Sequence, residues 1–433
     1  MAQNLPVRIV QDPGRGFTRR PAAAVRHPDL VLALDAYADD HIRARVYGTA
    51  VPATVGEYTA RLEVAPTALR ASAARLRALW KRELVAYEPV DEHGVPAPDR
   101  TPLPYATLLD FTAEPESELC VILDELVEQG AYLLWEELLG VGGRGAERLR
   151  KVLLATLGGD RPLRVRVDSP LFLPWPMLCL PAEYGAAGEP GLRPPDELLR
   201  RFLGYRHQIE QTGGVHSDFP DEEESPGLPP LPVVSLNHDT CLDSEGRTRA
   251  AEVAAALAVG TRRIERTRRP ELLDALRSGP LEEQLMYFWC HGHFRPTEEP
   301  GAPRFVVQLS DHQDIDAYTV LARRGTGGLF PYRPLVVFNA CYAGLTGAAD
   351  VTHIGGALLR AGAGGVLGPQ IEMPQVFAAE YAHAFVTRYL PGTETAGEIM
   401  HALGRHFADV LHNPLGFAYA LHCGMDHRLE RAW

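Results

Sequence analysis

The chain has 433 residues, of which 45% are hydrophobic and 23% are charged; this composition excludes wholesale disorder, and the length predicts roughly three domains. The formal net charge is −13 and no basic stripe stands out, which argues against nucleic-acid binding as the main role. No apolar run is long enough to cross a membrane, and the first residues lack the basic start and apolar stretch of a secretory signal.

Residues 1–112 predict a small β-rich domain. Residues 42–47 and 57–64 alternate apolar and polar side chains, as half-buried strands do, and a more apolar strand is expected at 30–35. Residues 68–85 have the apolar spacing of an amphipathic helix. Because no pattern here indicates chemistry, we expect this region to serve docking or regulation.

A second region, 113–216, is expected to begin with helices and to continue into a strand. The helices are predicted at 117–128, 132–139 and 147–157, and the strand at 163–167. Residues 217–232 contain four consecutive acidic residues and five prolines, a composition that cannot pack a core. This stretch therefore predicts an acidic, proline-rich linker.

Residues 233–433 alternate strands with helices, which indicates an α/β fold with a mainly parallel sheet flanked by helices. Strands are expected at 233–237, 262–267, 285–290, 305–311, 335–340, 364–369 and 416–423. Helices are expected at 245–258, 270–279, 353–362, 375–389 and 395–411.

Two of these strands run into reactive side chains. One is followed by His291 and Gly292, and the other by Cys341, 50 residues after the histidine. Ligands of open α/β sheets bind outside the carboxyl ends of strands, so the two tips can meet there. A cysteine nucleophile needs a base, which His291 would supply. The backbone N–H groups of Gly292 and Cys341 would form an oxyanion hole.

Each of these signals has a structural alternative. A single cysteine at a strand end is usually a small buried apolar residue, and a single histidine is usually a structural or surface residue. The six cysteines occur singly, without a C-x-x-C pair, which favours a cytoplasmic chain with reduced thiols over a disulfide framework or a zinc ribbon. No orienting carboxylate is evident, and a Cys–His dyad would suffice.

Three further patterns are weaker. Residues 140–145 fit G-x-G-x-x-G, but they follow an expected helix, whereas a dinucleotide site follows a strand. Cys290, His291 and His293 suggest zinc, but neighbouring strand residues point to opposite faces and no second ligand pair has metal spacing. The acidic run 221–224 is more simply explained as a solvated linker than as a cation site. We therefore expect no metal and no cofactor.

The motifs HGHF and NACYAG resemble the His-Gly and Ala-Cys motifs of caspase-like cysteine proteases. Asn339 in place of glutamine, and a glycine that comes one residue late, at Gly344, point away from true caspases. The pattern is more similar to the CHAT family, bacterial relatives of caspases and separases. Further resemblances lie in the segments 163–181, 245–257, 272–292, 358–370 and 413–424.

This resemblance implies a thiol endopeptidase with His291 as base, Cys341 as nucleophile, and the Gly292 and Cys341 amides as oxyanion hole. It implies two caspase-like halves, an inactive one over 113–216 and a catalytic one over 233–433. It also implies regulated cleavage of a partner protein encoded nearby, often in bacterial antiphage defence, where gasdermins are one substrate class. An activating or regulatory partner is possible within that picture.

The substrate preference is open at this point. A pocket for a basic side chain needs a buried acid, and the candidates are Asp239, Asp243 and Glu372, each of which is more often a solvated loop acid. Two other functions compete with the protease. One is a catalytically silent scaffold or adaptor that uses the caspase fold. The other is an acyltransferase or thiol hydrolase acting on small substrates.

Overall fold

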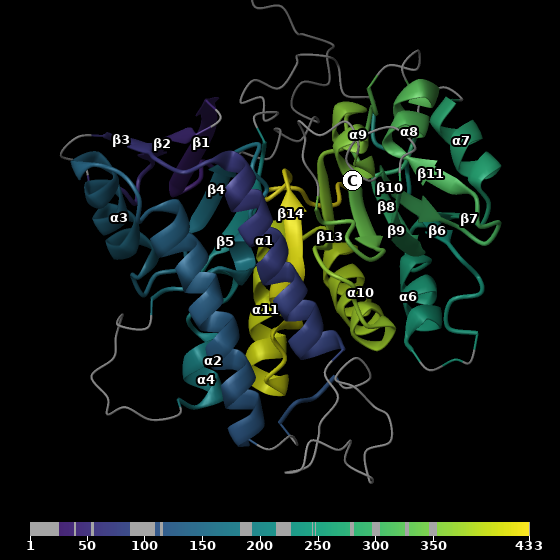
Figure 1. Ribbon diagram of the computed structural model, residues 1–433. Coiled ribbons are helices and arrows are strands. Elements are labelled where there is room, and N and C mark those ends of the chain that lie inside the picture. Colours follow the sequence, from purple (N-terminus) through teal and green to yellow (C-terminus); the bar gives the residue numbers. More distant parts are fainter. Residues whose placement is uncertain are drawn as a thin grey trace, which may run out of the picture.

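One large β-sheet runs through the described part of the chain (Figure 1). The structure is a computed structural model that describes residues 26–38, 40–52, 56–86, 109–112, 116–181, 193–213, 227–244, 246, 248–277, 281–296, 304–324, 329–345 and 353–432. Within these residues, eleven strands form the sheet in the order β3-β2-β1-β4-β5-β14-β13-β12-β8-β6-β7. Their bounds are β1 (Leu30–Ala38), β2 (His41–Tyr47), β3 (Glu57–Leu62), β4 (Arg164–Asp168), β5 (Gln208–Gln211), β6 (Val233–His238), β7 (Arg262–Arg266), β8 (Leu285–Trp289), β12 (Leu335–Asn339), β13 (Gly365–Pro369) and β14 (Tyr419–His422).

Most neighbouring strands of this sheet run parallel, and the antiparallel pairs are β1–β2, β2–β3 and β13–β14. The central strands β8 and β12 are buried along their whole length, as expected of parallel strands covered on both faces. On one face Phe288 and Phe338 stack with ring centroids 4.5 Å apart, while Tyr287 and Trp289 enter the core on the other face. The prediction of a mainly parallel sheet is confirmed.

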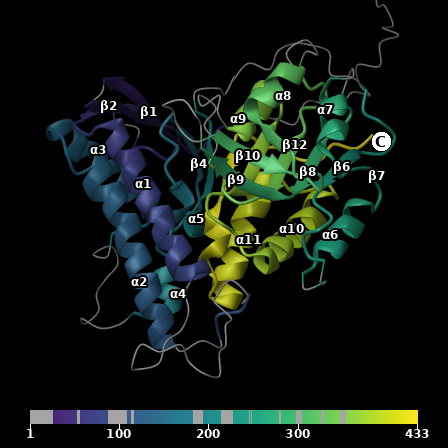
Figure 2. The ribbon, with the colours of Figure 1, turned by 45° about the vertical axis from the view of Figure 1, so that its right-hand side comes forward.

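Helices cover both faces of the sheet (Figure 2). One face carries α6 (Ala250–Leu257), α10 (Gln375–Tyr389) and α11 (Ala396–Leu411). The opposite face carries α7 (Arg269–Arg277), α8 (Ala317–Arg324) and α9 (Ile354–Arg360). The larger of the two cores also includes α1 (Pro66–Trp80), α2 (Glu116–Tyr132), α3 (Arg144–Leu157), α4 (Pro195–Leu199), α5 (Leu203–Arg206), the π-helical segments η1 (Lys81–Val85) and η4 (Leu133–Leu138), and the 3₁₀ segments η5 (Trp175–Met177) and η6 (Pro414–Ala418).

The N-terminal strands belong to the same sheet as the rest of the molecule. β1 pairs in parallel with β4, so β1, β2 and β3 extend the sheet at one edge. At the centre, β14 from the C-terminal end lies between β5 and β13. The N-terminal region is therefore β-rich, as predicted, and its strands continue one sheet with both later regions.

The two helices predicted at 117–128 and 132–139 form one continuous helical rod. Helix α2 passes directly into the π-helical segment η4. Gly130, which separates the two predicted helices, lies inside α2 where the helix packs closely on the carbonyl of Met177. A Cβ at this position would lie 2.7 Å from that oxygen, so the glycine serves close packing rather than a helix end.

The residues after β8 form a second, smaller sheet. β9 (His291–Arg295), β10 (Arg304–Gln308) and β11 (Asp314–Asp316) pair antiparallel in the order β11-β10-β9. The sequence predicted only one strand here, at 305–311, and placed it with the others. His291 and Gly292 therefore begin a strand of the small sheet.

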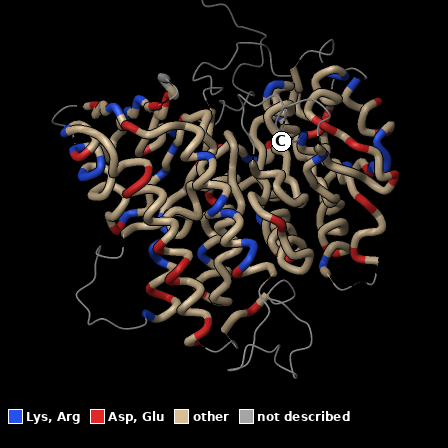
Figure 3. Tube along the Cα trace, viewed as in Figure 1, with Lys and Arg blue, Asp and Glu red and all other residues tan. Residues whose placement is uncertain are grey.

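Acidic and basic residues are interspersed along the described chain, as the colours of the backbone trace in Figure 3 show. Among the described helices, none is both long and apolar enough to cross a membrane.

Candidate active site

The candidate catalytic residues follow three neighbouring strands of the main sheet. β8 lies between β6 and β12, and its last residue, Trp289, is in register with the last residue of each neighbour. Asp239 comes directly after β6, while His291 and Cys341 come two residues after β8 and β12. Because all three strands are parallel, these side chains arrive at the same edge of the sheet.

His291 and Cys341 line one small cavity of about 120 Å³. Apolar side chains form most of its wall, and they come from the strand tips and from the segment that leads into α10. The other lining residues are Leu242, Trp289, Cys290, Asn339, Ala340, Met373, Gln375 and Ala378. Sites for whole small molecules are typically about 300–1,000 Å³, so this cavity accepts only part of a ligand.

Cys341 is the first residue of a tight turn. The next residue, Tyr342, has a left-handed backbone with φ of 62°. Burial raises the pKa of the thiol, and the charge of Glu372 raises it further. The backbone N–H of Met373 and the ammonium of Lys81 lower this pKa without offsetting burial. Within the described residues, no hydrogen bond joins the thiol to His291. The thiol is therefore held protonated at neutral pH.

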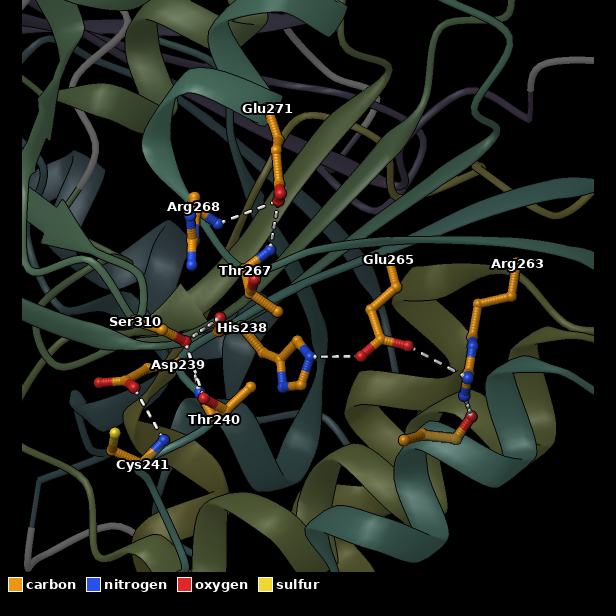
Figure 4. A network of polar contacts seen from close by, with 11 residues as sticks. His238, Asp239, Thr240, Cys241, Arg263, Glu265, Thr267, Arg268, Glu271 and Ser310 are labelled. Atoms are coloured by element: carbon orange, nitrogen blue, oxygen red, sulfur yellow. Dashed lines mark hydrogen bonds and ion pairs between the residues drawn. The ribbon is translucent and has the colours of Figure 1, made fainter.

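His291 faces a carboxylate that the sequence did not identify as its partner. Its Nε2 lies 3.8 Å from Oδ2 of Asp239, close enough for an ion pair but too far for a hydrogen bond. The Asp239 side chain is fully buried, and its Oδ1 accepts a hydrogen bond from the Cys241 backbone N–H at 2.9 Å (Figure 4). Oδ2 has no hydrogen-bond partner. A buried carboxylate oxygen without a donor is costly, and protonated His291 would supply one.

Gly292 packs directly against the catalytic turn. A Cβ on this residue would lie 2.4 Å from the carbonyl oxygen of Cys341 and 3.2 Å from Cβ of Ala340. Real Cβ atoms do not approach backbone oxygen this closely, so glycine is required for β9 to pass the turn. This contact brings the backbone of Gly292 next to Cys341, the candidate nucleophile.

The other two acids proposed for a substrate pocket are bound by side chains or backbone groups of the protein. Asp243 accepts hydrogen bonds from the backbone N–H of Thr248 at 3.0 Å and from its hydroxyl at 2.7 Å, which closes the loop after β6. Glu372 binds the ammonium of Lys81 at 2.7 Å and accepts a hydrogen bond from the Tyr342 hydroxyl at 3.1 Å. None of the three acids lines the cavity; Asp239 lies against His291, and the charge of Glu372 acts on Cys341.

Sequence reasoning missed two features of this site. The first is the orientation of Asp239 toward His291. Residues after parallel strands meet at one edge of the sheet, and this rule would have found Asp239 as well, because it also follows a buried strand. The second is Lys81, whose charge acts on a thiol 260 residues away in sequence. No local pattern in the sequence signals that contact.

The weaker patterns resolve simply where the structure describes them. Residues 140–145 follow the helical segment η4 and lead into α3, so no strand precedes the glycines. Cys290 is buried, and burial raises the pKa of its thiol. Among the described residues, no group of three His, Cys, Asp or Glu side chains is placed to hold a metal ion. The acidic run 221–224 lies outside the described residues.

Comparison with known proteins identifies a family for more than half of the chain. Residues 147–415 match the family model described as CHAT domain. Two solved structures of the Saccharomyces cerevisiae separase–securin complex are similar to it, with TM-scores of 0.40 and 0.42 at 10% and 8% sequence identity. Each of these matches covers 91% of this chain and 30% of the separase chain. No curated protein matches the sequence.

Proposed function

The chain belongs to the CHAT family, and on that premise we propose that it is a cysteine endopeptidase that cuts a specific partner protein. The observation that carries the proposal is the meeting of three side chains at one edge of the sheet. Cys341 and His291 line the same cavity, and the carboxylate of the buried Asp239 faces Nε2 of the His291 imidazole. Nucleophilic peptide cleavage requires a thiol and a base, and an acid that orients the base assists them.

The reaction begins with proton transfer from the Cys341 thiol to His291. The thiolate attacks the scissile carbonyl carbon, and the negative charge moves to the carbonyl oxygen, toward the Gly292 and Cys341 backbone N–H groups. The imidazolium returns its proton to the leaving amine as the C–N bond breaks, which leaves a thioester. Water, deprotonated by His291, then releases the acid product and regenerates the thiol.

Asp239 acts as a positioning residue in this mechanism. Because its carboxylate faces Nε2, the other ring nitrogen, Nδ1, is left to exchange the proton with the thiol. A carboxylate in this place also stabilises the imidazolium that forms during the attack. The 3.8 Å separation tightens to a hydrogen bond when the histidine becomes charged.

The resting enzyme is expected to be weakly active. The thiol is not hydrogen-bonded to His291 within the described residues, and its pKa lies above the ordinary cysteine value because of burial. Substrate or an activating partner would have to bring the two side chains together. Such a state suits a protease that must cut one partner and spare other proteins.

The biological setting is part of the proposal and rests on the family resemblance. We place the protein in the bacterial cytoplasm, in an antiphage defence system, with a substrate encoded nearby such as a gasdermin or another effector. The cavity of about 120 Å³ supports a peptide substrate, which would bury one side chain there and leave the rest of the chain outside. A small-molecule acyl transfer would need more enclosed space.

The test mixes the purified protein with each product of the neighbouring genes and reads intact masses. Wild type is compared with Cys341→Ala and His291→Ala, and Cys120→Ala on the remote helix α2 serves as matched control. A defined cut made by wild type and the control alone supports the endopeptidase. The same cut by Cys341→Ala contradicts it, and a partner that binds tightly but stays uncut by wild type favours the scaffold.

A further inference from the structure

Helix α1 and the segment after it reach the active site from the N-terminal region. Arg77, in the last turn of α1, and Lys81, four residues later, lie on the same helical face. One Arg77 guanidinium nitrogen donates to Oε1 of Gln370 at 3.2 Å and to the carbonyl of Phe172 at 2.6 Å. The Lys81 ammonium donates to Oε1 of Glu372 at 2.7 Å. Two side chains of α1–η1 therefore bind the side chains of residues 370 and 372.

Residues 369–373 are hydrogen-bonded to the turn that begins at Cys341. The Tyr342 backbone N–H donates to the carbonyl of Ile371 at 3.2 Å, and that of Gly344 donates to Pro369 at 2.7 Å. The contact at Gly344 is so close that a Cβ there would lie 2.0 Å from the carbonyl oxygen of Gly368. Any movement of the 369–373 segment is therefore transmitted to the nucleophile's own backbone.

The Arg77 guanidinium is buried. Burial lowers the pKa of its guanidinium to about 10, and the acceptors that it contacts, Phe172 and Gln370, are neutral. Gln370 is fully buried, and its backbone N–H donates to Ala418. A buried charge that loses its hydrogen-bond partners is strongly destabilising, so these two contacts hold Arg77, and with it α1, against this segment.

The Lys81 end is more exposed and acts through charge. The side chains of Lys81 and Glu372 are 39% and 41% exposed, so the pair adds little to stability. Its effect falls on Cys341, whose thiolate is favoured by Lys81 and disfavoured by Glu372. The other titratable groups around the thiol are His291, Cys290, Tyr342 and Tyr419.

We infer that α1–η1, which lies outside the matched CHAT domain, is a working part of the active site, with Lys81 as a positioning residue that sets the reactivity of Cys341 through Glu372. The inference rests on the proposed function for its catalytic meaning. On this inference, the N-terminal region acts on Cys341 through two routes: the hydrogen bonds of Arg77 and Lys81 to residues 370–372, and the charge of Lys81. A partner that displaces α1 would change the reactivity of the thiol without touching it.

The test measures the pH dependence of Cys341 alkylation by iodoacetamide, followed by mass spectrometry of the peptide that carries this cysteine. Lys81→Met leaves Glu372 unopposed, so the rate at neutral pH falls about three-fold. Glu372→Gln removes the opposing charge, so the rate rises by a similar factor. The double variant returns toward the wild-type rate. Lys151→Met, on α3, is the matched control because it removes the only other lysine in the chain.

Opposite shifts in the two single variants support the inference, since a merely structural loss of the ion pair would move both rates in one direction. Equal shifts, or wild-type rates in both, overturn it. Melting temperatures within about 2 °C of wild type show that each variant is folded. Alkylation needs no substrate, so opposite shifts support the inference even if no partner is cut, whereas cleavage with unshifted alkylation refutes the inference alone.

Discussion

Replacing Asp239 with asparagine removes the charge behind His291 and keeps the side-chain oxygen that accepts from the Cys241 backbone N–H. A unit charge pair 3.8 Å apart is worth about 4 kcal/mol at an effective dielectric constant of 20. Because the His291 side chain is 54% exposed, solvent screening reduces this to about 2 kcal/mol. We expect kcat/KM to fall about 30-fold.

The assay is the steady-state cleavage of a peptide that spans the cut identified with the native partner. Asp239→Asn should lower kcat/KM for every peptide by a similar factor, whichever residue precedes the cut. It should not lower the melting temperature, because it relieves a buried carboxylate oxygen that has no hydrogen-bond partner. Asp243→Asn is the matched control, since that carboxylate is bound by Thr248 in the same loop.

Three results would refute this reasoning. Activity within about three-fold of wild type would show that the charge does not orient the histidine. A loss confined to peptides with a basic residue before the cut would instead make Asp239 the acid of a substrate pocket, a role for which the sequence offered it as one of three candidates. A drop in melting temperature together with activity would indicate a structural role.

Three further predictions concern the turn, the thiol and the histidines. Gly292→Ala forces a Cβ against the Cys341 carbonyl oxygen and should cost about 1–3 kcal/mol in urea unfolding together with the loss of cleavage; wild-type stability would contradict the contact. Because burial raises the pKa of the Cys341 thiol, its alkylation rate should still be rising at pH 9; a plateau near the ordinary cysteine pKa would contradict this. Burial lowers the pKa of His207 and His422 to about 4, so both are neutral in the folded state while the unfolded chain takes up protons below about pH 6.5. Stability should therefore fall as pH drops from 6.5 to 4, by about 3 kcal/mol for each histidine, as urea unfolding across this range would measure; a flat profile would refute it.

Local patterns in the sequence were sufficient for the α/β class and for placing His291 and Cys341 at the same edge of the sheet. Continuous apolar runs such as 285–290 and 335–340 mark strands buried on both faces, and the residues after parallel strands share one edge of the sheet. The positions of His291 and Cys341 in the cavity follow from those two rules. The helical patterns at 117–139 and 147–157 also fall where the structure has α2, η4 and α3.

What depends on contacts between distant residues was decided only by the tertiary structure. Gly130 interrupts the helical pattern in sequence, yet it lies inside α2 because Met177 packs against it. The strand that begins at His291, β9, pairs with β10, and β1 joins the main sheet by pairing with β4. The alternation of apolar and polar residues within a strand does not encode such pairings.

The candidate active site likewise combines features that the sequence predicted with features that only the tertiary structure shows. Asp239 was recognised as an acid at a strand tip, but its direction toward His291 depends on β6 lying beside β8. The contact of Lys81 with Glu372 requires α1 to pack across 291 residues of intervening sequence. Side-chain type and periodicity are local properties that a sequence carries directly. Which side chains face one another is settled by long-range packing, because each element can satisfy its own pattern in many arrangements.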